Sequence, residues 1–374
     1  MKDRPLISFV LGCYNQEPFI REAVEGAFAQ TYSPLEIVIS DDCSSDRTFD
    51  IVREMVAGYQ GPHSVRINRN ETNLGNGMNL NRAMEWCHGA LVVVAGGDDI
   101  SLPLRTEVTY QAWEQFERRP TSICSSYTTI ARNGIVQGMG GFRGDPNDSR
   151  PLQLLAGNLF EFLSTQQPAA CGCSHAWTPG LFSYFGPLRT DLEDLILSFR
   201  SLAIGQILYI RQPLVKYRRH GGNVSFLATG EDDSSSFAHR EKRLRWVDEQ
   251  TVRAYGNLLA DIETLRQQDR ITVAERDRLS HEARRVRNVY ALEQEIMAGT
   301  FSGKLRALAG AARRGNFKCV WRFLPRLLPR PIYRTLYLLK NRNRPSRRAG
   351  GPAASVKLMV SVVLLMFLSL RVGI

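Results

Sequence analysis

Two short acidic clusters, each directly after an apolar run, are the residues of this sequence best suited to chemistry. Asp41 and Asp42 end one run in IVISDDCSSDRT, and Asp98 and Asp99 end another in LVVVAGGDDISLP. Apolar runs of this length, bounded by turn residues, are typical of buried parallel strands. Open parallel sheets bind ligands at the carboxyl ends of their strands. The four carboxylates would then share one crevice, which suits a nucleotide and a divalent metal ion and indicates an enzyme.

The segments around these clusters alternate between strand and helix patterns. Strand-like runs cover Leu6–Cys13, Leu35–Ser40, Val65–Asn68 and Ala90–Ala95, and helical spacing of apolar residues covers Phe19–Gln30, Thr48–Tyr59 and the stretch NLGNGMNLNRAMEWCHG. Such an alternation predicts a doubly wound α/β sheet with right-handed crossovers. The acidic clusters then lie at neighbouring strand ends.

Beyond Pro103 the pattern is looser. Helices are predicted at Arg105–Arg118 and Asp191–Ala203, strands at Ser122–Ile130 and Gln206–Ile210, and a loop at the glycine-rich Gly134–Arg150. The polar run Glu231–Ser236 is the predicted end of the α/β domain, residues 1–230. Residues 231–300 have densely mixed charges and sparse apolar residues, which favours exposed helices at Ala238–Tyr255, Leu258–Gln268 and Val273–Met297.

The charge of the chain is concentrated at one end. The 374 residues carry a net charge of +11, with 43% hydrophobic and 23% charged residues, as in ordinary globular proteins. From Phe301 to Ile374 there are 16 Lys and Arg and no Asp or Glu, so the first 300 residues are slightly acidic. A one-sided basic tail indicates an anionic partner, either lipid headgroups or nucleic acid.

The tail divides into a basic amphipathic segment with a linker, residues 301–352, and an apolar end, residues 353–374. The first part interleaves Arg and Lys with Leu, Trp, Phe and Tyr, which suits a helix on an anionic lipid surface. Leu358–Leu370 is uncharged but shorter than the about 20 residues that a spanning helix needs. We expect attachment to an anionic membrane surface, with docking on a partner protein as the alternative. Nucleic acid is not expected, because no nucleic-acid module accompanies the charge.

The cysteines and the N-terminus indicate the compartment. The seven cysteines are odd in number and scattered, and the one close pair, Cys171 and Cys173, lacks the second pair that a zinc site needs. We interpret them as reduced thiols of a cytosolic protein. The first residues, MKDRPLISFVLGCYNQ, enter a strand-like run without a cleavage site, which does not fit a signal peptide. The expected location is the cytoplasmic face of the cell membrane.

Five motifs occur in the order seen in family 2 glycosyltransferases. They are ISFVLGCYN, AFAQTYSPLEIVISDDCSSDRT, NLGNGMNLNRA, GGDDISLP and LEDLILSFR…YIRQPLVKYRRHGGNVS. The chain resembles this family over Pro5–Ser225, about 60% of its length. The resemblance implies a GT-A fold: a Rossmann-like, mostly parallel α/β sheet that is flanked by helices and merged with an acceptor-binding half. The helical, basic C-terminal residues form an extension beyond it.

The resemblance assigns the first acidic pair to the donor nucleotide. Asp41, with Asp42 beside it, would bind the base and ribose, because a carboxylate accepts hydrogen bonds from a base N–H and from ribose hydroxyls. Asp46 is interpreted as a cap of the helix that follows. A positive charge at Arg218 would stabilise charge on the leaving diphosphate. The residues that the resemblance places at the donor, beside the two aspartates, are Asn15, Asn73, Gly75 and Arg218.

The second acidic pair matches the family's metal-binding motif. Mg²⁺ or Mn²⁺ prefers carboxylate oxygens together with phosphates and water, so Asp98 is the predicted direct ligand and Asp99 a ligand or a partner of one. His220, in YRRHGGNVS, is a further metal or phosphate contact, although a lone histidine is more often structural. Gly96 stands where many family members have an acidic residue, and Leu80 where many have an arginine. A solvated turn is the alternative for GGDD.

The third acidic motif, LEDLILSFR, matches the family's catalytic base. The resemblance carries this role to the pair Glu193 and Asp194, and within the pair to Asp194, which would take the proton of the acceptor hydroxyl. General-base catalysis needs one carboxylate within hydrogen-bond reach of that proton. Acidic residues also favour a helix N-terminus, which is the alternative explanation.

These motifs together predict an inverting, metal-dependent glycosyltransferase. It would move a sugar from a nucleotide-diphosphate sugar to a hydroxyl of a glycan or lipid-linked acceptor in the biosynthesis of cell-surface polysaccharide. Two alternatives stay open. One is a non-catalytic, membrane-associated scaffold with a GT-A-like fold, which the departures at Gly96 and Leu80 favour. The other is a sugar nucleotidyltransferase, although LGCYNQEPF lacks the glycine- and lysine-rich loop that a triphosphate would require.

Overall fold

A computed structural model of the chain describes residues 4–141, 149–155, 157–165, 169–221, 223, 237–298, 306, 308 and 309. Two compact units emerge from the contacts, one made of Met1–Asp233 with Gln250–Arg287 and the other of Ser234–Glu249 with Asn288–Ile374. The predicted segments 301–352 and 353–374 lie outside the described residues, apart from positions 306, 308 and 309. The predicted membrane attachment of the tail therefore stays a prediction, as do the domain boundaries.

Four parallel strands form the first half of the sheet, in the order β3-β2-β1-β4. They are β1 (Ile7–Cys13), β2 (Leu35–Asp41), β3 (Ser64–Arg69) and β4 (Leu91–Gly96). The register pairs Cys13 with Asp41 and Gly12 with Gly96, so β1, β2 and β4 end at one edge. Because both acidic clusters directly follow these strand ends, the fold brings them to the same edge of the sheet, as the sequence predicted.

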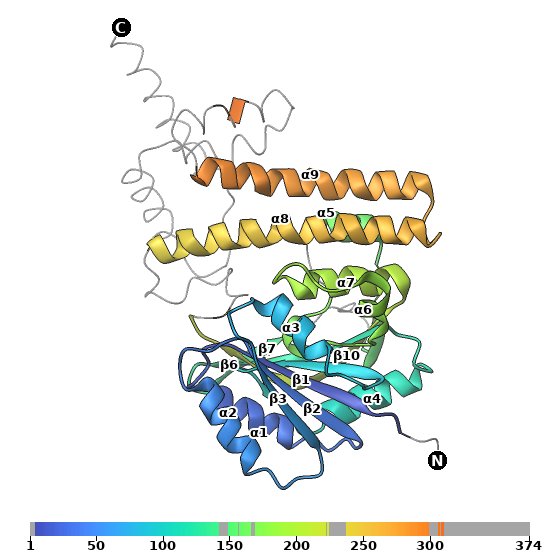
Figure 1. Cartoon of the computed structure of the whole chain (residues 1–374). Helices are drawn as coiled ribbons and strands as arrows, with labels where there is room; N and C mark the ends of the chain where they lie inside the picture. Colours follow the sequence, from blue (N-terminus) through green and yellow to red (C-terminus); the bar gives the residue numbers. More distant parts are fainter. Residues whose placement is uncertain are drawn as a thin grey trace, which may run out of the picture. The chain divides into compact units, whose positions relative to one another are not determined.

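Helices cover both sides of this half. In Figure 1, α1 (Ile20–Phe28) and α2 (Thr48–Ala57) lie on one side of the sheet and α3 (Asn76–Met84) lies on the other. The main hydrophobic core packs Phe9 and Leu11 of β1 against Val24 of α1, Val52 of α2 and Trp113 of α4 (Arg105–Gln115). Burial of apolar side chains on this scale is the dominant stabilising contribution to such a fold.

The second half of the sheet is mixed. Its longest strand, β10 (Ile207–Arg219), runs parallel to β6 (Ser122–Ala131) and antiparallel to β5 (Ile100–Ser101) and β8 (Leu152–Leu155). Strand β9 (Ala176–Trp177) pairs antiparallel with both β4 and β6 and joins the two halves. The predicted α/β class with flanking helices, the arrangement that the GT-A resemblance implied, is confirmed, but the sheet is mixed because the second half adds antiparallel strands.

Two predictions about local structure are wrong. The loop predicted at Gly134–Arg150 contains β7 (Val136–Gly140), which pairs with β6 in a hairpin whose turn includes Gly134 at positive φ. The break predicted after Tyr255 is absent, because α8 (Phe237–Gln267) runs through it before α9 (Val273–Ala298) begins. Glycine content favoured a loop in the first case, and densely mixed charges with sparse apolar residues favoured separate exposed helices in the second, but tertiary contacts override both signals.

The stretch between β8 and β10 is built of short helices. They are α5 (Leu159–Thr165), the 3₁₀ helix η1 (Gly172–Ser174), α6 (Gly180–Phe185) and α7 (Glu193–Ile204). From Gln250 onward α8 is not an exposed helix, since it buries an apolar stripe with helical spacing: Ala254, Tyr255, Leu258, Ile262 and Leu265. That part of α8 belongs to the same compact unit as the sheet.

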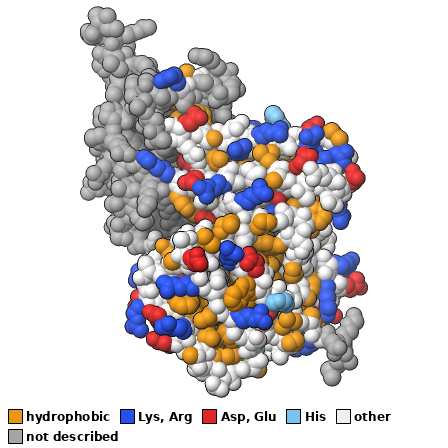
Figure 2. Space-filling model, viewed as in Figure 1, with side chains coloured by type: hydrophobic (Ala, Val, Ile, Leu, Met, Phe, Trp, Pro, Cys, Tyr) orange, Lys and Arg blue, Asp and Glu red, His pale blue; other side chains and the backbone are white. Residues whose placement is uncertain are grey.

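The described surface has no block of one charge sign on the face seen in Figure 2, where basic and acidic side chains are interspersed with hydrophobic ones. The excess of positive charge lies in the sequence beyond Phe301. None of the helices within the described residues is both long enough and apolar enough to cross a membrane.

Candidate functional site

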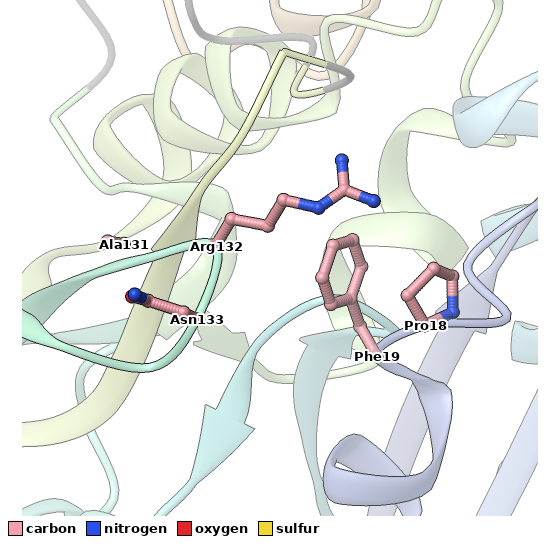
Figure 3. Close-up of a pocket in the computed structure, with 5 residues that line it drawn as sticks. All are labelled: Pro18, Phe19, Ala131, Arg132 and Asn133. Carbon is pink, nitrogen blue, oxygen red and sulfur yellow. The ribbon is translucent and has the colours of Figure 1, made fainter.

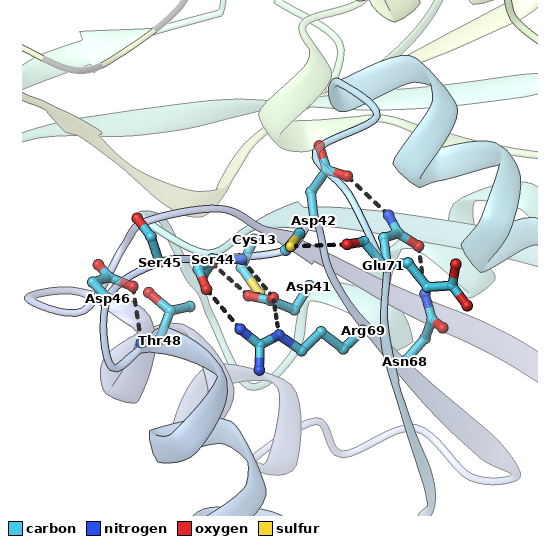
Figure 4. A network of polar contacts seen from close by, with 12 residues as sticks. Cys13, Asp41, Asp42, Ser44, Ser45, Asp46, Thr48, Asn68, Arg69 and Glu71 are labelled. Atoms are coloured by element: carbon cyan, nitrogen blue, oxygen red, sulfur yellow. Dashed lines mark hydrogen bonds and ion pairs between the residues drawn. The ribbon is translucent and has the colours of Figure 1, made fainter.

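Asp41 closes the turn that follows β2. Its carboxylate accepts hydrogen bonds from the backbone N–H of Ser44 at 2.8 Å and from the Ser44 hydroxyl at 2.5 Å, and Arg69 Nε lies 3.7 Å away. Figure 4 shows Ser44, Arg69 and Cys13 gathered around this carboxylate. Because Asp41 is fully buried, its visible role is to shape the loop, and its predicted contact with a nucleotide stays a prediction.

Asp42 holds the turn before α3. Its two oxygens accept hydrogen bonds from the backbone N–H groups of Leu74 and Gly75, at 2.9 and 2.8 Å, and from the Asn70 amide at 2.9 Å. Gly75 has φ +88°, a conformation that glycine adopts without the Cβ clash of other residues. The neighbouring Asn73 is exposed. The sequence-predicted residues Asp42, Asn73 and Gly75 are therefore brought together at one turn.

Asn15 joins the loop after β1 to the Asp41 turn. It has a positive φ of 51°, and its Oδ1 accepts a hydrogen bond from the backbone N–H of Ser45 at 2.8 Å, while its own N–H donates to Ser44 Oγ at 2.9 Å. The loop thus lies along the edge at which β1 and β2 end. Its role in donor binding stays a prediction, and its position at the strand ends is the one that a nucleotide site in this fold requires.

The second acidic cluster forms a turn at the end of β4. Asp98 Oδ2 lies 2.9 Å from His220 Nε2 and accepts a hydrogen bond from the Asn223 amide at 3.1 Å. A Cβ added to Gly96 would lie 2.9 Å from Asp98 Oδ1, closer than real Cβ contacts come. The glycine that departs from the family pattern therefore leaves room for the Asp98 carboxylate to lie back over the turn.

Asp99 and Arg218 fix this turn to β10. The backbone N–H of Arg218 donates to Asp99 Oδ1 at 2.8 Å, and its buried guanidinium donates to the Asp98 carbonyl at 3.0 Å, the Arg132 carbonyl at 2.9 Å and Glu22 Oε2 at 3.1 Å. Burial, with the adjacent charge of Asp98, raises the pKa of Asp99 well above its usual range. Both side chains thus hold the Asp98 turn in place, and their predicted contacts with metal and donor stay predictions.

The donor set at this turn fits a divalent ion that is completed by its substrate. Asp98 and His220 offer one carboxylate and one imidazole nitrogen side by side. Within the described residues no group of three or more His, Cys, Asp and Glu is arranged to hold a metal ion. Mg²⁺ and Mn²⁺ sites in phosphate-transfer chemistry use one or two protein ligands, with phosphates and water in the other positions. That Asp98 and His220 hold such an ion stays a prediction.

The third acidic motif lies at the start of α7. Glu193 and Asp194 begin the helix, and the Glu193 carboxyl lies against the backbone of Gly172 in η1, where a Cβ would be 2.9 Å from Glu193 Oε1. Loss of solvation raises the pKa of Glu193 to about 8, with a further contribution from the charge of Asp194, although the Asn76 side chain is a hydrogen-bond partner that opposes the shift. An acid with a pKa near operating pH, beside a second acid, is an arrangement suited to proton transfer.

Sequence reasoning missed the residues that hold the third motif. Asp191 Oδ1 accepts a hydrogen bond from the backbone N–H of Gly77 at 3.0 Å, at the start of α3. The Thr190 carbonyl passes so close to Gly77 that an added Cβ would lie 1.9 Å from it. The glycine spacing of NLGNG was noted, but nothing in the sequence says that its partner lies more than 110 residues away.

An open pocket of about 510 Å³ lies beside the Asp98 turn. It is lined by Pro18, Phe19, Ala131, Arg132 and Asn133. Figure 3 shows the Arg132 side chain extended toward the Phe19 ring, whose centroid is 5.5 Å from the guanidinium carbon. The Phe19 ring also contacts the His220 ring, with 4.7 Å between the two ring centroids. The pocket thus adjoins the Asp98–His220 contact through Phe19.

Comparison with known sequences identifies the N-terminal part of the chain. The model of glycosyl transferase family 2 matches residues 8–131, which include the Asp41 and Asp98 clusters but not the α7 pair or His220. The putative glycosyltransferase EpsE of Bacillus subtilis is 31% identical over 107 residues, which are 29% of this chain and 38% of EpsE. The matched stretches span 34–38% of the length of the first curated relatives.

Solved structures show a weaker likeness over more of the chain. S. aureus TarS 1–349, in complex with UDP-GlcNAc, is 17% identical with a TM-score of 0.47 and covers 84% of this chain and 89% of its own. The mannosyltransferase PcManGT from Pyrobaculum calidifontis, in complex with GDP-Man and Mn²⁺, is 15% identical with a TM-score of 0.45 and covers 91% and 85%.

Proposed function

Residues 8–131 belong to glycosyl transferase family 2, and from this premise we propose that the chain transfers a sugar from a nucleotide-diphosphate sugar to a hydroxyl of an acceptor, with inversion at the anomeric carbon. The observation that carries the proposal beyond the family match is the Glu193–Asp194 pair, in which the pKa of Glu193 is raised to about 8. An acid whose pKa is shifted toward neutral pH, with a second acid beside it, is a candidate proton-transfer site.

In this mechanism Asp194 is the base and Glu193 keeps its proton. Two adjacent carboxyl groups that cannot both ionise at low cost share their charge unequally. The pKa of Glu193 is raised to about 8, so this acid holds its proton more tightly than an ordinary glutamate does, and Asp194 is the proposed charged member of the pair. Asp194 would accept the proton of the substrate's hydroxyl group as that oxygen attacks the sugar. Glu193 would stay neutral, so Asp194 would be the one carboxylate of the pair that can take the proton.

The Asp98 turn serves the leaving group. Asp98 and His220 would hold Mg²⁺ or Mn²⁺, and a bound ion offsets negative charge on the departing nucleoside diphosphate. Arg218 and Asp99 keep the turn rigid, so the position of Asp98 is set before the donor arrives. Preorganisation of this kind is what makes charge stabilisation effective in a site with little water.

The acceptor and the location are proposed from the sequence outside the described residues. The basic segment 301–352 and the apolar residues 353–374 suit attachment to an anionic membrane surface. An enzyme held there would meet a glycan or lipid-linked acceptor of cell-surface polysaccharide biosynthesis. Vesicle co-sedimentation of the full chain, with and without anionic lipid, tests this part separately from the chemistry, and equal recovery with neutral and anionic vesicles would contradict it.

The experiment that tests the function uses UDP-GlcNAc and GDP-mannose as probes, each with and without Mn²⁺. We expect one of them to stabilise the protein against heat, because a ligand at about 100 times its Kd adds about 2.7 kcal/mol. Asp98→Asn should lose the Mn²⁺-dependent part of that stabilisation. Asp194→Asn should keep it and lose release of the nucleoside diphosphate. Absence of stabilisation by either probe, with both variants indistinguishable from the wild type, would favour the scaffold alternative, and release of pyrophosphate from a nucleoside triphosphate would favour the nucleotidyltransferase.

A further inference from the structure

We propose that Gln250, on helix α8, is a positioning residue for the catalytic pair of α7. This inference rests on the proposed function, since it takes Glu193 and Asp194 as the proton-transfer pair. Gln250 lies far outside the segment that matches the family model, residues 8–131. With this role, the C-terminal helical region takes part in the transfer reaction, although its sequence predicted exposed helices.

Gln250 forms hydrogen bonds with Thr190 and Asp191, which lie shortly before the catalytic pair in the sequence. Its Oε1 accepts hydrogen bonds from the backbone N–H of Asp191 at 3.0 Å and from Thr190 Oγ1 at 3.2 Å. The same hydroxyl also lies 3.1 Å from the Gln250 carbonyl and accepts from the backbone N–H of Leu192 at 3.2 Å. Gln250 and Thr190 are 4% and 3% exposed, so water does not replace these contacts easily.

Asn257, a second residue of α8, also contacts the segment that leads into α7. The backbone N–H of Arg189 donates to Asn257 Oδ1 at 3.1 Å, and the Asn257 amide donates to Asp261 Oδ1 at 3.3 Å. Asp261 in turn forms a bidentate, fully buried ion pair with Arg200 of α7, at 2.8 and 3.1 Å. Gln250, Asn257 and Asp261 lie on one face of α8, and all three contact α7 or the segment that leads into it.

Helix α3 also forms hydrogen bonds with the segment Leu188–Glu193. Asn81 exchanges two hydrogen bonds with the backbone of Leu188, each 2.9 Å long. Gly77 donates to Asp191, and Asn76 is a hydrogen-bond partner of Glu193. The segment Leu188–Glu193 is therefore fastened by side chains or backbone of α3 and α8 at nearly every residue. A loop with so many partners has little freedom to move.

The hydrogen bonds that fasten residues 188–193 matter for the reaction, because a general base must stay within reach of the proton that it accepts. Asp191 lies next to the pair, and its charge, like that of Asp194, raises the pKa of Glu193. Catalysis by a positioned base is sensitive to displacement, and an error of about 1 Å can cost about 100-fold in rate. A neutral amide oxygen at Gln250 offers the acceptor that the Asp191 N–H needs without adding a further negative charge.

Tyr255 gives a matched control on the same helix. It is as buried as Gln250, and its hydroxyl donates one hydrogen bond, 2.8 Å long, to the Leu163 carbonyl in α5. Tyr255→Phe therefore removes a buried hydrogen bond of α8 that does not lead to the pair. Gln250→Leu removes the acceptor with little change in volume, and Gln250→Glu keeps an acceptor oxygen but brings a further acid toward Asp191.

The test uses the full chain and two measurements. Amide hydrogen exchange of the peptide that covers residues 188–193 should be about tenfold faster in Gln250→Leu and within twofold of the wild type in Tyr255→Phe. Release of nucleoside diphosphate from UDP-GlcNAc or GDP-mannose should fall 10- to 100-fold in kcat for Gln250→Leu, with donor Kd within twofold. Gln250→Glu should recover part of the rate and shift the rising limb of the kcat–pH profile to higher pH.

The outcomes separate this inference from the proposed function. Unchanged exchange of the 188–193 peptide in Gln250→Leu overturns the inference whatever the activity. Equal loss of kcat in Gln250→Leu and Tyr255→Phe overturns it too, because the loss would then reflect general stability. If the wild type releases no nucleoside diphosphate and does not differ from Asp194→Asn, the proposed function fails, while the exchange measurement still decides whether Gln250 holds the segment.

Discussion

The Asp41–Asp42 turn and the Glu193–Asp194 pair differ in what their carboxyl oxygens contact. In the first half, the carboxylates of Asp41 and Asp42 accept hydrogen bonds from backbone N–H groups and from Ser44 and Asn70. In the second half, Glu193 stands beside another acid, and its pKa is raised to about 8. A carboxylate surrounded by donors is suited to stay charged and to hold a loop, whereas one that faces like charge is suited to exchange a proton.

Replacement of Asp194 tests the second half of this comparison and should give the largest effect. Asp194→Asn removes the proposed base, and general-base catalysis contributes about 10²- to 10⁴-fold, so kcat should fall by that factor with donor affinity unchanged. Glu193→Gln is the matched variant, because a mostly protonated acid is mimicked by an amide, and its kcat at pH 7 should stay within about tenfold of the wild type. Steady-state release of nucleoside diphosphate measures both. Equal losses in the two variants would contradict the division of roles.

The buried ion pair that anchors α8 should give the next largest effect, on stability. Arg200 and Asp261 are 0% and 1% exposed, and burial raises the pKa of Asp261 although Arg200 opposes the shift. Asp261→Asn leaves the arginine without a counter-charge, which typically costs about 3–5 kcal/mol in the free energy of unfolding. The control is Asp269→Asn, at the surface pair with Arg266, where the cost should stay below about 1 kcal/mol. Urea unfolding compares the two, and similar shifts would contradict the prediction.

A smaller loss is expected where the first half uses its carboxylate to hold a turn. Asp42→Asn places an N–H₂ group against at least one of the donors of Leu74, Gly75 and Asn70, so a buried donor loses its acceptor at a cost of about 1–3 kcal/mol. Thermal unfolding measures the loss, and Glu71→Gln, an exposed neighbour, is the control. A stable Asp42→Asn variant with weakened donor binding would instead assign Asp42 a direct contact with the nucleotide.

The first half was the more predictable part of the fold. Strands β1, β2 and β4 have mostly apolar runs followed by turn residues, and these local signals place Asp41 and Asp98 at strand ends that the register then aligns. In the second half the same local signals found β6 and β10 but missed β9, which is two residues long, and β7, which lies in a glycine-rich stretch. Short strands of this kind are stabilised by their neighbours in the sheet and leave little trace in the sequence.

The site shows the same division. The candidate catalytic and metal-binding acids could be named from motifs, because their residue types and spacing are local. What positions them could not, since Gln250 contacts Asp191 across 59 residues and Gly77 contacts it across 114. A glutamine on a charged helix resembles any solvated side chain until the fold shows that it is buried. The departure at Gly96 likewise had no sequence explanation before its closeness to Asp98 was visible.

The last prediction concerns pH and is the smallest in free energy. The pKa of Glu193 is raised from its ordinary value of 4.5 to about 8 in the folded protein, so the folded state binds the proton more tightly than the unfolded state. The destabilising effect of its charge is therefore absent below pH 4.5, grows as pH rises through this window, and is complete above about 8. Because Glu193 is in part open to water, we expect a loss on the order of 1 kcal/mol rather than the full shift.

Urea unfolding at several pH values between 5 and 9 measures this loss. Glu193→Gln should flatten the decline, since an amide does not titrate, and should be more stable than the wild type at pH 8 but not at pH 5. Asp42→Asn, whose effect comes from hydrogen bonds in the first half, should lower the free energy of unfolding by a similar amount at every pH in this range. Parallel curves for the wild type and Glu193→Gln would show that the α7 pair carries no stored repulsion, and the contrast between the two acidic regions would then reduce to their hydrogen-bond partners.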